Sequence, residues 1–153
     1  YLRYLSHSTK NLYNVTLYNI RQYFFENGKY LNYFKNQKEI KFHNDYLSLP
    51  SDLAQQTMML LNQNFSSFFA LLKLKKAGKY DKPVFIPGYL EKEAFFILQF
   101  PIRKGHNLTD FTIRVNSKLQ KQFKIKKVKI PRPDYISGKT LKQVRILPKY
   151  DGK

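Results

Sequence analysis

The stretch "SDLAQQTMMLLNQNFSSFFALLKLKKAG", residues 51 to 78, has no charged side chain between Leu53 and Leu72, although the formal net charge of the chain is +18. A membrane-spanning helix needs about 20 predominantly apolar residues, and amide and hydroxyl side chains interrupt this run. In hydrocarbon each of these groups would lack a hydrogen-bond partner, which is costly. The stretch is therefore predicted to be a helix that does not cross a membrane.

Apolar residues recur along this stretch at every third or fourth position, which predicts one buried helical stripe. The stripe consists of Ala54, Met58, Leu61, Phe65, Phe68 and Leu72. Ser51 or Asp52 can cap the start of the helix, and Gly78 can end it. The last turn, where cations suit the helix dipole, holds Lys73, Lys75 and Lys76. The opposite face carries amides in place of the usual Glu and Lys, which indicates that it meets something other than water.

The composition is that of a chain that can fold. Its 153 residues suffice for one domain or two small lobes, and a hydrophobic content of 42% is enough to build a core. No cysteine occurs, which excludes disulfides and cysteine-ligated zinc and gives no sign of an oxidising compartment. No secretory signal pattern opens the chain, so we expect a cytoplasmic protein. The first residue is Tyr rather than Met, which suggests a trimmed or incomplete chain.

Charge is unevenly distributed along the chain. Residues 1 to 81 hold 11 basic and 5 acidic side chains, a net charge of +6, and residues 82 to 153 hold 17 and 5, a net charge of +12. A basic surface attracts polyanions, and nucleic-acid binding gains affinity from counterion release without special geometry. Nucleic acid is therefore the first candidate partner, although a ribosomal or membrane-surface protein can have a similar balance.

The pattern of apolar residues predicts an α+β fold in two parts. Residues 1 to 78 are expected to form a three-helix lobe, with helices over residues 2 to 26, 31 to 41 and 51 to about 76, and a turn over residues 43 to 50. Residues 79 to 153 are expected to form a small, incomplete β-barrel. Its predicted strands cover residues 94 to 100, 111 to 115, 123 to 130 and 143 to 147. The apolar phase changes at Lys126 and Lys127, where a β-bulge would restore the register.

No arrangement of side chains in the sequence indicates catalysis. The acidic residues of the second half are scattered, whereas two-metal nuclease chemistry needs several carboxylates that converge on the ions. The 3 histidines are isolated and lack the spacing of a zinc site. Neither a Gly-x-Ser-x-Gly motif nor a Gly-rich phosphate loop occurs. We expect no catalysis, no metal and no cofactor in this chain alone.

Residues 118 to 132 form a basic run without acids. Its members are Lys118, Lys121, Lys124, Lys126, Lys127, Lys129 and Arg132. On a strand, Lys124 and Lys126 would project together on the face opposite two apolar residues, which suits a phosphate-binding face backed by a core face. A solvated edge strand protected by lysines has the same pattern.

Aromatic residues are a second feature of the composition. The chain has 12 Tyr and 13 Phe. Tyrosines cluster at Tyr13, Tyr18, Tyr23, Tyr30 and Tyr33. Exposed tyrosines can stack on bases, and buried ones fill a core with the hydroxyl group at the surface.

Four stretches, "TKNLYNVTLYNIRQYFFENGKYLNY", "LPSDLAQQTMMLLNQNFSSFFALLK", "KPVFIPGYL" and "QVRILPK", resemble in order and spacing the N-terminal half of TnpB proteins. These are the OrfB probable transposases of small bacterial insertion sequences, and they are similar to the ancestors of type V CRISPR effectors. The resemblance covers nearly the whole chain. It rests on the combination of stretches rather than on a single motif.

The resemblance implies an RNA-guided DNA endonuclease carried by transposons, whose partners are a guide RNA and target DNA. In this family a helical recognition lobe, here residues 1 to 78, is inserted into a wedge β-barrel, here residues 79 to 153. Together they grip the guide RNA and read a short motif beside the target. A RuvC-like domain with three acidic residues and a zinc ribbon then cuts. This chain ends at "ILPKYDGK", where the catalytic domain would begin, and lacks the first wedge strand, so we expect binding without cleavage.

By position, the resemblance implies four motif-reading residues: Tyr33, Ser51, Asp52 and Gln55. Gln55 is the strongest candidate because glutamine can form two hydrogen bonds with adenine. With Asp52 as N-cap, Gln55 is also the third residue of a capping box and can close the helix end instead. Ser51 and Asp52 stand where the family has basic or aromatic residues. The expected contacts to the nucleic-acid backbone are the basic run and Lys73, Lys75 and Lys76.

Two other interpretations follow from the same sequence. The chain is a fragment of an intact nuclease whose catalytic half is missing here, or it is a stand-alone structural RNA-binding protein of the ribosomal type. An acid-bearing RuvC-like segment downstream in the gene would identify the first of these.

Overall fold

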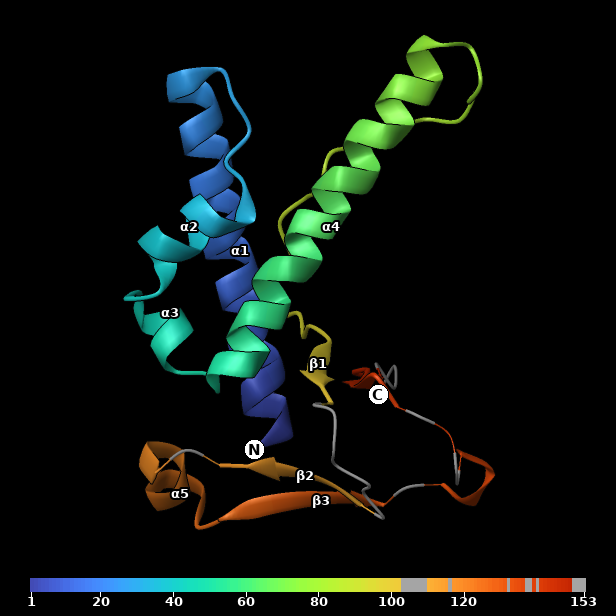
Figure 1. Ribbon diagram of the computed structural model, residues 1–153. Coiled ribbons are helices and arrows are strands. Elements are labelled where there is room, and N and C mark those ends of the chain that lie inside the picture. Colours follow the sequence, from blue (N-terminus) through green and yellow to red (C-terminus); the bar gives the residue numbers. More distant parts are fainter. Residues whose placement is uncertain (103–109, 116, 132, 137–138, 140, 150–153) are drawn as a thin grey trace.

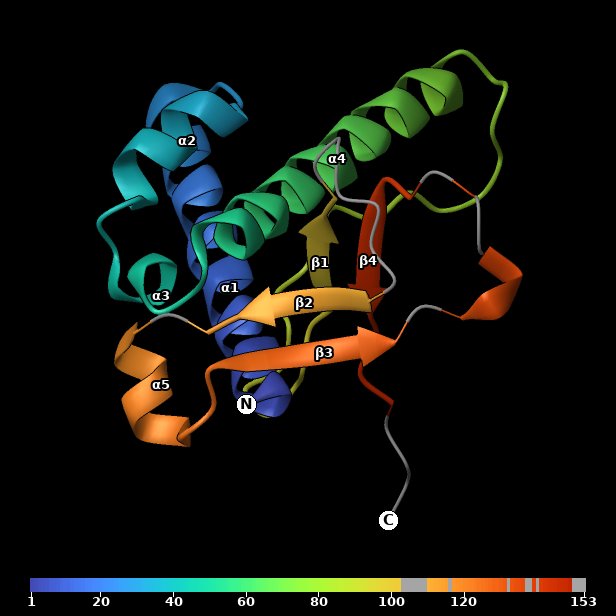
Figure 2. The same ribbon diagram turned by 60° about the horizontal axis from the view of Figure 1, so that its bottom comes forward.

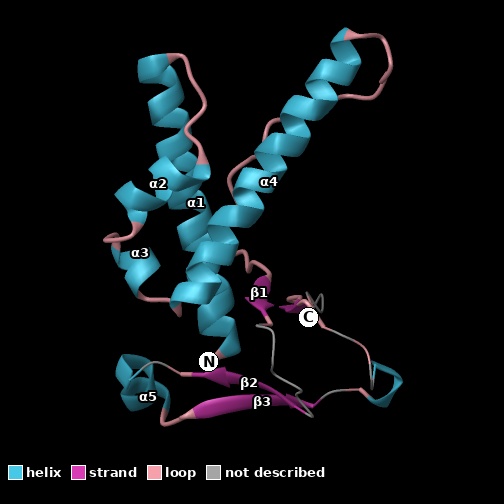
Figure 3. Ribbon diagram, in the orientation of Figure 1, coloured by secondary structure: helices cyan, strands magenta, loops and turns pink. Residues whose placement is uncertain are grey.

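A computed structural model describes residues 1–102, 110–115, 117–131, 133–136, 139 and 141–149 (Figure 1). Its helices are α1 (Leu2–Asn27), α2 (Tyr33–Ile40), α3 (Asn44–Leu47), α4 (Ser51–Lys76) and α5 (Ser117–Phe123), with a 3₁₀ turn at Asp134–Ile136. Its strands are β1 (Leu98–Pro101), β2 (Asp110–Arg114), β3 (Lys127–Pro131) and β4 (Gln143–Ile146). The predicted α+β class is confirmed, and Figure 3 shows α1 to α4 gathered at one end of the molecule and the strands at the other.

The two long helices, α1 and α4, form the frame of the molecule. They lie together near the strands and diverge toward their C-terminal ends (Figure 1). The predicted stripe of α4 faces this contact: Ala54, Met58, Leu61 and Phe65 are buried, and Phe68 is partly buried. The helical period of the sequence therefore predicted the core face of α4 correctly.

The helix ends are partly as predicted. Gly28 (φ 63) ends α1, with its N–H donating to the Phe24 carbonyl at 2.8 Å, and Gly78 (φ 68) follows α4. Both glycines adopt the left-handed conformation that other residues avoid. The predicted N-cap of α4 is wrong, because Pro50 is the N-cap and Ser51 and Asp52 lie inside the first turn. Proline has no backbone N–H, and the start of a helix does not need one. The helix therefore begins at Ser51, earlier than a cap at Ser51 or Asp52 would allow.

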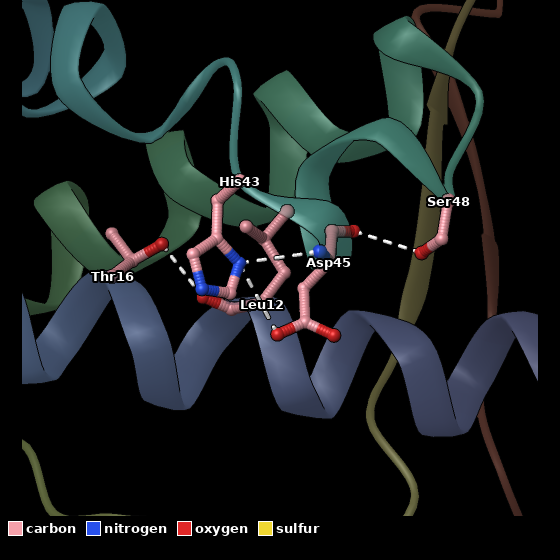
Figure 4. A network of polar contacts seen from close by, with 5 residues as sticks. All are labelled: Leu12, Thr16, His43, Asp45 and Ser48. Carbon is pink, nitrogen blue, oxygen red and sulfur yellow. Dashed lines mark hydrogen bonds and ion pairs between the residues drawn. The ribbon is translucent and has the colours of Figure 1, made fainter.

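Side chains of polar residues cap α2 and α3. The Asn32 Oδ1 accepts from the Lys35 N–H at 3.1 Å and starts α2. The predicted turn after α2 contains the short helix α3, where the His43 Nδ1 accepts from the Asp45 N–H at 3.2 Å (Figure 4). The Ser48 Oγ donates to the Asp45 carbonyl at 3.0 Å and closes the same turn. The bonds to Asn32 and His43 satisfy free N–H groups at a helix start, and the Ser48 bond satisfies a backbone carbonyl.

Buried amides attach α2 to α1. The side chain of Asn36 is buried, and its Nδ2 donates to the Thr16 carbonyl at 3.2 Å. The Asn19 Nδ2 donates to the Asn36 Oδ1 at 2.9 Å and to the Glu39 Oε2 at 2.6 Å. The Thr16 Oγ1 in turn donates to the Leu12 carbonyl at 2.7 Å (Figure 4). Both the amide nitrogen and the amide oxygen of Asn36 thus have a partner, which buried amides require.

The strands form two separate antiparallel pairs. In the first pair Leu98 of β1 lies opposite Ile146 of β4, and in the second Ile113 of β2 lies opposite Val128 of β3. The β2–β3 hairpin crosses the N-terminal end of α1, beneath it in Figure 1 and in front of it in Figure 2. Within the described ranges these strands do not close into a barrel. Where an incomplete barrel was predicted, the described strands form two small sheets.

The predicted bulged strand after residue 122 is wrong. Phe123 is the last residue of α5, Lys124 has a left-handed backbone (φ 53), and β3 begins only at Lys127. The Phe123 ring packs on Tyr1 and Tyr4, with centroids 5.7 and 5.3 Å apart. The change of apolar phase therefore marks a passage from helix through a turn to a strand, and not a bulge.

The predicted strand at residue 94 begins later than expected, at Leu98. The preceding residues belong to the return segment, which we define as residues 79 to 97, between α4 and β1. Its Phe96 exchanges hydrogen bonds with Ser6 of α1: the Phe96 N–H donates to the Ser6 carbonyl at 3.1 Å, and the Ser6 Oγ donates to the Phe96 carbonyl at 2.5 Å. These groups are thus paired with a helix in place of a neighbouring strand.

One hydrophobic cluster joins the two predicted parts of the chain. It contains buried side chains of α1 and α4, such as Leu5 and Met58, together with Leu98, Ile113 and Leu119 from beyond residue 78. The division of the chain into two domains at residue 78 stays a prediction. This hydrophobic cluster contains residues from both sides of that position. As for a membrane, no helix in the described part of the chain combines the length and apolar character needed to span one.

Candidate nucleic-acid interface

Strand β3 separates a basic face from a core face. Lys127 and Lys129 are exposed, whereas Val128 and Ile130 are partly buried against the core cluster. The alternation follows from the two-residue period of a strand. Among the described strands, β3 pairs only with β2, so it is also an edge strand. Both predicted roles, phosphate contact and edge protection, are compatible with this geometry.

Three more lysines lie exposed just before β3. Together we call the five residues the hairpin lysines: Lys121, Lys124, Lys126, Lys127 and Lys129. The placement predicted for Lys124 and Lys126 on a strand is wrong, because both lie in the turn after α5. No acidic residue occurs between Ser117 and Pro131. The hairpin lysines therefore form a cluster of positive charge with no acidic residue in its own stretch of sequence, and Asp110 lies on the paired strand, opposite Pro131. The side chain of Lys118 and the whole of Arg132 lie outside the described residues.

Lys73, Lys75 and Lys76 occupy a second and separate position. They are exposed in the last turn of α4, as predicted. In Figure 1 this end of α4 lies far from the β2–β3 hairpin, at the opposite end of the molecule. The structure thus divides the predicted backbone contacts between two surfaces.

The four predicted motif-reading residues come from two neighbouring helices. Ser51, Asp52 and Gln55 lie in the first two turns of α4, and Tyr33 is the first residue of α2, which contacts α4. Ser51 is exposed and the other three are half-buried. Because Pro50 is the N-cap, Gln55 is not the third residue of the helix, and the capping-box role considered for it is wrong.

Tyr33 is constrained by its surroundings. Its ring packs against the core cluster and lies 5.3 Å from the ring of Phe34. Burial raises the pKa of the Tyr33 hydroxyl, and the neighbouring Tyr46 raises it further. The hydroxyl therefore stays protonated at neutral pH and can both donate and accept a hydrogen bond.

The amide-rich face of α4 is partly explained by contacts inside the molecule. The terminal amides of Gln56 and Gln99 lie 3.1 Å apart, and that of Gln99 lies 2.8 Å from that of Gln143 on β4. With its amide oxygen turned toward Arg145, Gln143 accepts from the guanidinium at 2.7 and 2.8 Å. On the other side of α4, the Tyr30 hydroxyl donates to Asn62 at 3.0 Å. Neutral amides replace charges where α4 meets other elements.

Sequence reasoning missed the polar face of α1, which holds the return segment. The Asn14 side chain forms two hydrogen bonds with the backbone of Leu90, at 2.8 and 2.9 Å. The Lys10 Nζ donates to the Lys92 carbonyl at 2.6 Å, and the Lys10 side chain is buried. The spacing of Ser6, Lys10 and Asn14 at every fourth position was the available signal, since it puts polar groups on one helix face.

Comparison with models of known protein families finds no match, and comparison with curated proteins finds none either. The resemblance to TnpB proteins is therefore a hypothesis supported by the quoted stretches alone. Within the residues that the structure describes, no group of three or more His, Asp or Glu side chains could hold a metal ion. The expectation that this chain alone does not catalyse a reaction stays a prediction.

Proposed function

We propose that the chain binds guide RNA and target DNA as the recognition and wedge-like parts of a TnpB-type transposon protein, without cutting DNA itself. The observation that carries the proposal is the cluster of hairpin lysines, five exposed side chains of α5, the turn after it and one face of β3. Phosphates bound there would release counterions, which supplies affinity independent of sequence. The core face of the same hairpin anchors this surface to α1.

The test of this surface is the salt dependence of RNA binding. Fluorescence anisotropy with a labelled, structured RNA should give a log–log salt slope that flattens by about one unit for each phosphate that the variant no longer binds. The test variants are Lys127→Gln with Lys129→Gln, and the same change at Lys124 and Lys126. The matched control replaces two exposed lysines elsewhere, Lys29→Gln with Lys38→Gln. A slope that is the same in all variants would assign the hairpin lysines to edge protection.

Motif reading is proposed for the start of α4. Gln55→Ala should lose about 1–3 kcal/mol of discrimination at one base pair, the range for a two-bond contact to a base. Because Gln55 does not cap the helix, its free energy of unfolding should change by about 0.5 kcal/mol or less. Selection from a randomised duplex pool, followed by sequencing, measures the preference. An unchanged preference with a clear loss of stability would remove Gln55 from the proposed reading site.

Binding without cleavage is the remaining part of the proposal. The purified chain with Mg²⁺ should leave DNA intact, because the described residues hold no convergent carboxylates. Metal-dependent cleavage that persists through repurification would contradict it. Affinity for structured RNA with no sequence preference on DNA would instead favour the structural RNA-binding protein of the ribosomal type.

A further inference from the structure

The return segment turns back along α4 directly after Gly78 (Figures 1 and 2). Its first residues are held against the end of the helix. The Lys79 N–H donates to the Leu74 carbonyl at 2.9 Å, and the Lys75 Nζ donates to the Lys82 carbonyl at 3.4 Å. The lysines in the last turn of α4 therefore lie close to the lysines at the start of the return segment.

The middle of the return segment is fixed from the side of α1. The Arg21 Nη2 donates to the Pro87 carbonyl at 3.0 Å, and the Arg21 guanidinium lies 4.6 Å from the centroid of the Tyr89 ring. Pro83 and Pro87 restrict the backbone further, since proline fixes φ. The segment has no strand partner among the described residues and is nevertheless held in one place. A segment ordered beforehand loses little conformational entropy when it binds a ligand.

Aromatic rings project from this fixed segment into solvent. The Phe85 side chain is 81% exposed and that of Tyr89 is 47% exposed. Five exposed lysines precede them in the chain, in the last turn of α4 and at the start of the segment: Lys73, Lys75, Lys76, Lys79 and Lys82. Between positions 73 and 93, six lysines outnumber three acidic residues, Asp81, Glu91 and Glu93, which leaves a net charge of +3. Exposed rings beside an excess of positive charge are the two components of sites that bind single-stranded nucleic acid, where rings stack on bases and cations contact phosphates.

We propose that the return segment binds unpaired bases of a single-stranded nucleic acid, with Phe85 and Tyr89 as the stacking rings and the five neighbouring lysines as phosphate contacts. The inference rests on the proposed nucleic-acid function and deepens it, because it assigns a second site with a different ligand. Bases inside a duplex are stacked on each other and offer no free face, so the ligand must be unpaired.

Two other occupants fit this surface less well. A second copy of the chain would bring the same five lysines against each other, and like charges across an interface oppose association. A lipid surface would cover polar groups on the adjacent turns of α4, Gln63 and Ser67, which are exposed. Acyl chains would leave these groups without partners, whereas sugars, phosphates and base edges can hydrogen-bond with them.

The test compares a labelled oligothymidine with an abasic oligonucleotide of equal length and charge, by fluorescence anisotropy with the full chain. The wild type should bind the oligothymidine more tightly. Phe85→Ala and Tyr89→Ala should each weaken that binding by about fivefold or more, the lower end of the stacking range, and leave binding of the abasic strand unchanged. Tyr89→Phe keeps the ring and should bind like the wild type. Phe34→Ala removes a similarly exposed ring from α2 and is the matched control.

Equal affinity for the two oligonucleotides, or unchanged affinity in Phe85→Ala, would overturn the proposal. Phe85 makes the decisive variant because its ring is mostly exposed, so its loss should not disturb the fold. Vesicles of phosphatidylcholine and phosphatidylserine form a further arm, and binding to them that is lost in Phe85→Ala, without base-dependent binding, would assign the segment to a membrane surface and overturn the proposal. The hairpin lysine variants, tested on structured RNA, report on the proposed function separately.

Discussion

The β2–β3 hairpin and the return segment both lie against α1, but different chemistry attaches them. The hairpin contributes Ile113 and Val128 to a hydrophobic cluster that includes Leu5 of α1. The return segment packs Leu90 and Phe96 against a second cluster, but its backbone is also held by hydrogen bonds from polar side chains of α1, such as Asn14. Apolar attachment uses every second residue of a strand and leaves the alternate ones free to carry lysines. Attachment through the backbone leaves the side chains of a segment available for another role.

The largest expected effect concerns the apolar attachment. Ile113→Ala should lower the free energy of unfolding by about 2–5 kcal/mol, because the side chain is 3% exposed and its loss leaves a cavity. Urea denaturation measures the change. Ile86→Ala in the return segment is the control, since that side chain is half exposed and should cost about 0.5 kcal/mol or less. Similar losses at both positions would show that the two regions are not attached differently.

A smaller effect is expected at the polar attachment. Asn14→Ala removes two hydrogen bonds to Leu90 and should cost about 1–3 kcal/mol, since backbone groups are left without partners. It should also speed proteolysis within the return segment, because local opening needs less free energy. Asn27→Ala, which removes only a bond to the Tyr23 carbonyl within α1, is the matched control. If Asn14→Ala leaves proteolysis unchanged, other contacts hold the segment.

The turn between α5 and β3 gives a change of opposite sign. Lys124→Gly should raise the free energy of unfolding by up to about 1 kcal/mol, because φ of 53 is costly for a residue with a Cβ and free for glycine. The greater freedom of glycine in the unfolded chain offsets part of the gain. The same substitution at Lys129, inside β3, should instead cost about 0.5–1 kcal/mol. A loss at both positions would favour one continuous strand.

The smallest expected effect is a pH dependence at Tyr30, which packs against the second hydrophobic cluster, between α1 and α4. Burial raises the pKa of its hydroxyl to about 12. The folded state keeps the proton that the unfolded chain loses near pH 10, so this contribution is present below pH 10 and is lost between pH 10 and about 12. Because the side chain is only half-buried, solvent reduces the effect to about 1 kcal/mol or less.

Tyr30→Phe is the variant that isolates this contribution. At neutral pH it should be less stable than the wild type by about 0.5–1.5 kcal/mol, because the hydrogen bond to Asn62 is removed. The difference should shrink as the pH approaches 12, while the other tyrosines affect both proteins equally. Urea denaturation along a pH series measures it. A constant difference across the series would show that Tyr30 titrates normally.

The sequence by itself determined the features that local physical chemistry controls. The period of apolar residues located both long helices and the buried stripe of α4, and the glycines at 28 and 78 marked where those helices end. The apolar residues at 128 and 130 likewise located a strand there, although the basic face predicted at Lys124 and Lys126 lies at Lys127 and Lys129 in the structure. These patterns are readable because each one depends on neighbours within a few positions of the chain.

Contacts between distant residues decided the rest. The short apolar run around Phe123 fits a strand as well as a helix, and the packing of its ring on Tyr1 and Tyr4 accompanies helix α5. In the sequence, the polar face of α1 cannot be told from an ordinary solvated face. In the structure the return segment covers it, and the polar side chains of α1 form hydrogen bonds with the backbone of the segment. The split of the lysines between the end of α4 and the β2–β3 hairpin also depends on the tertiary fold, because α4 runs away from the β2–β3 pair, and the spacing of residues along the chain does not show this.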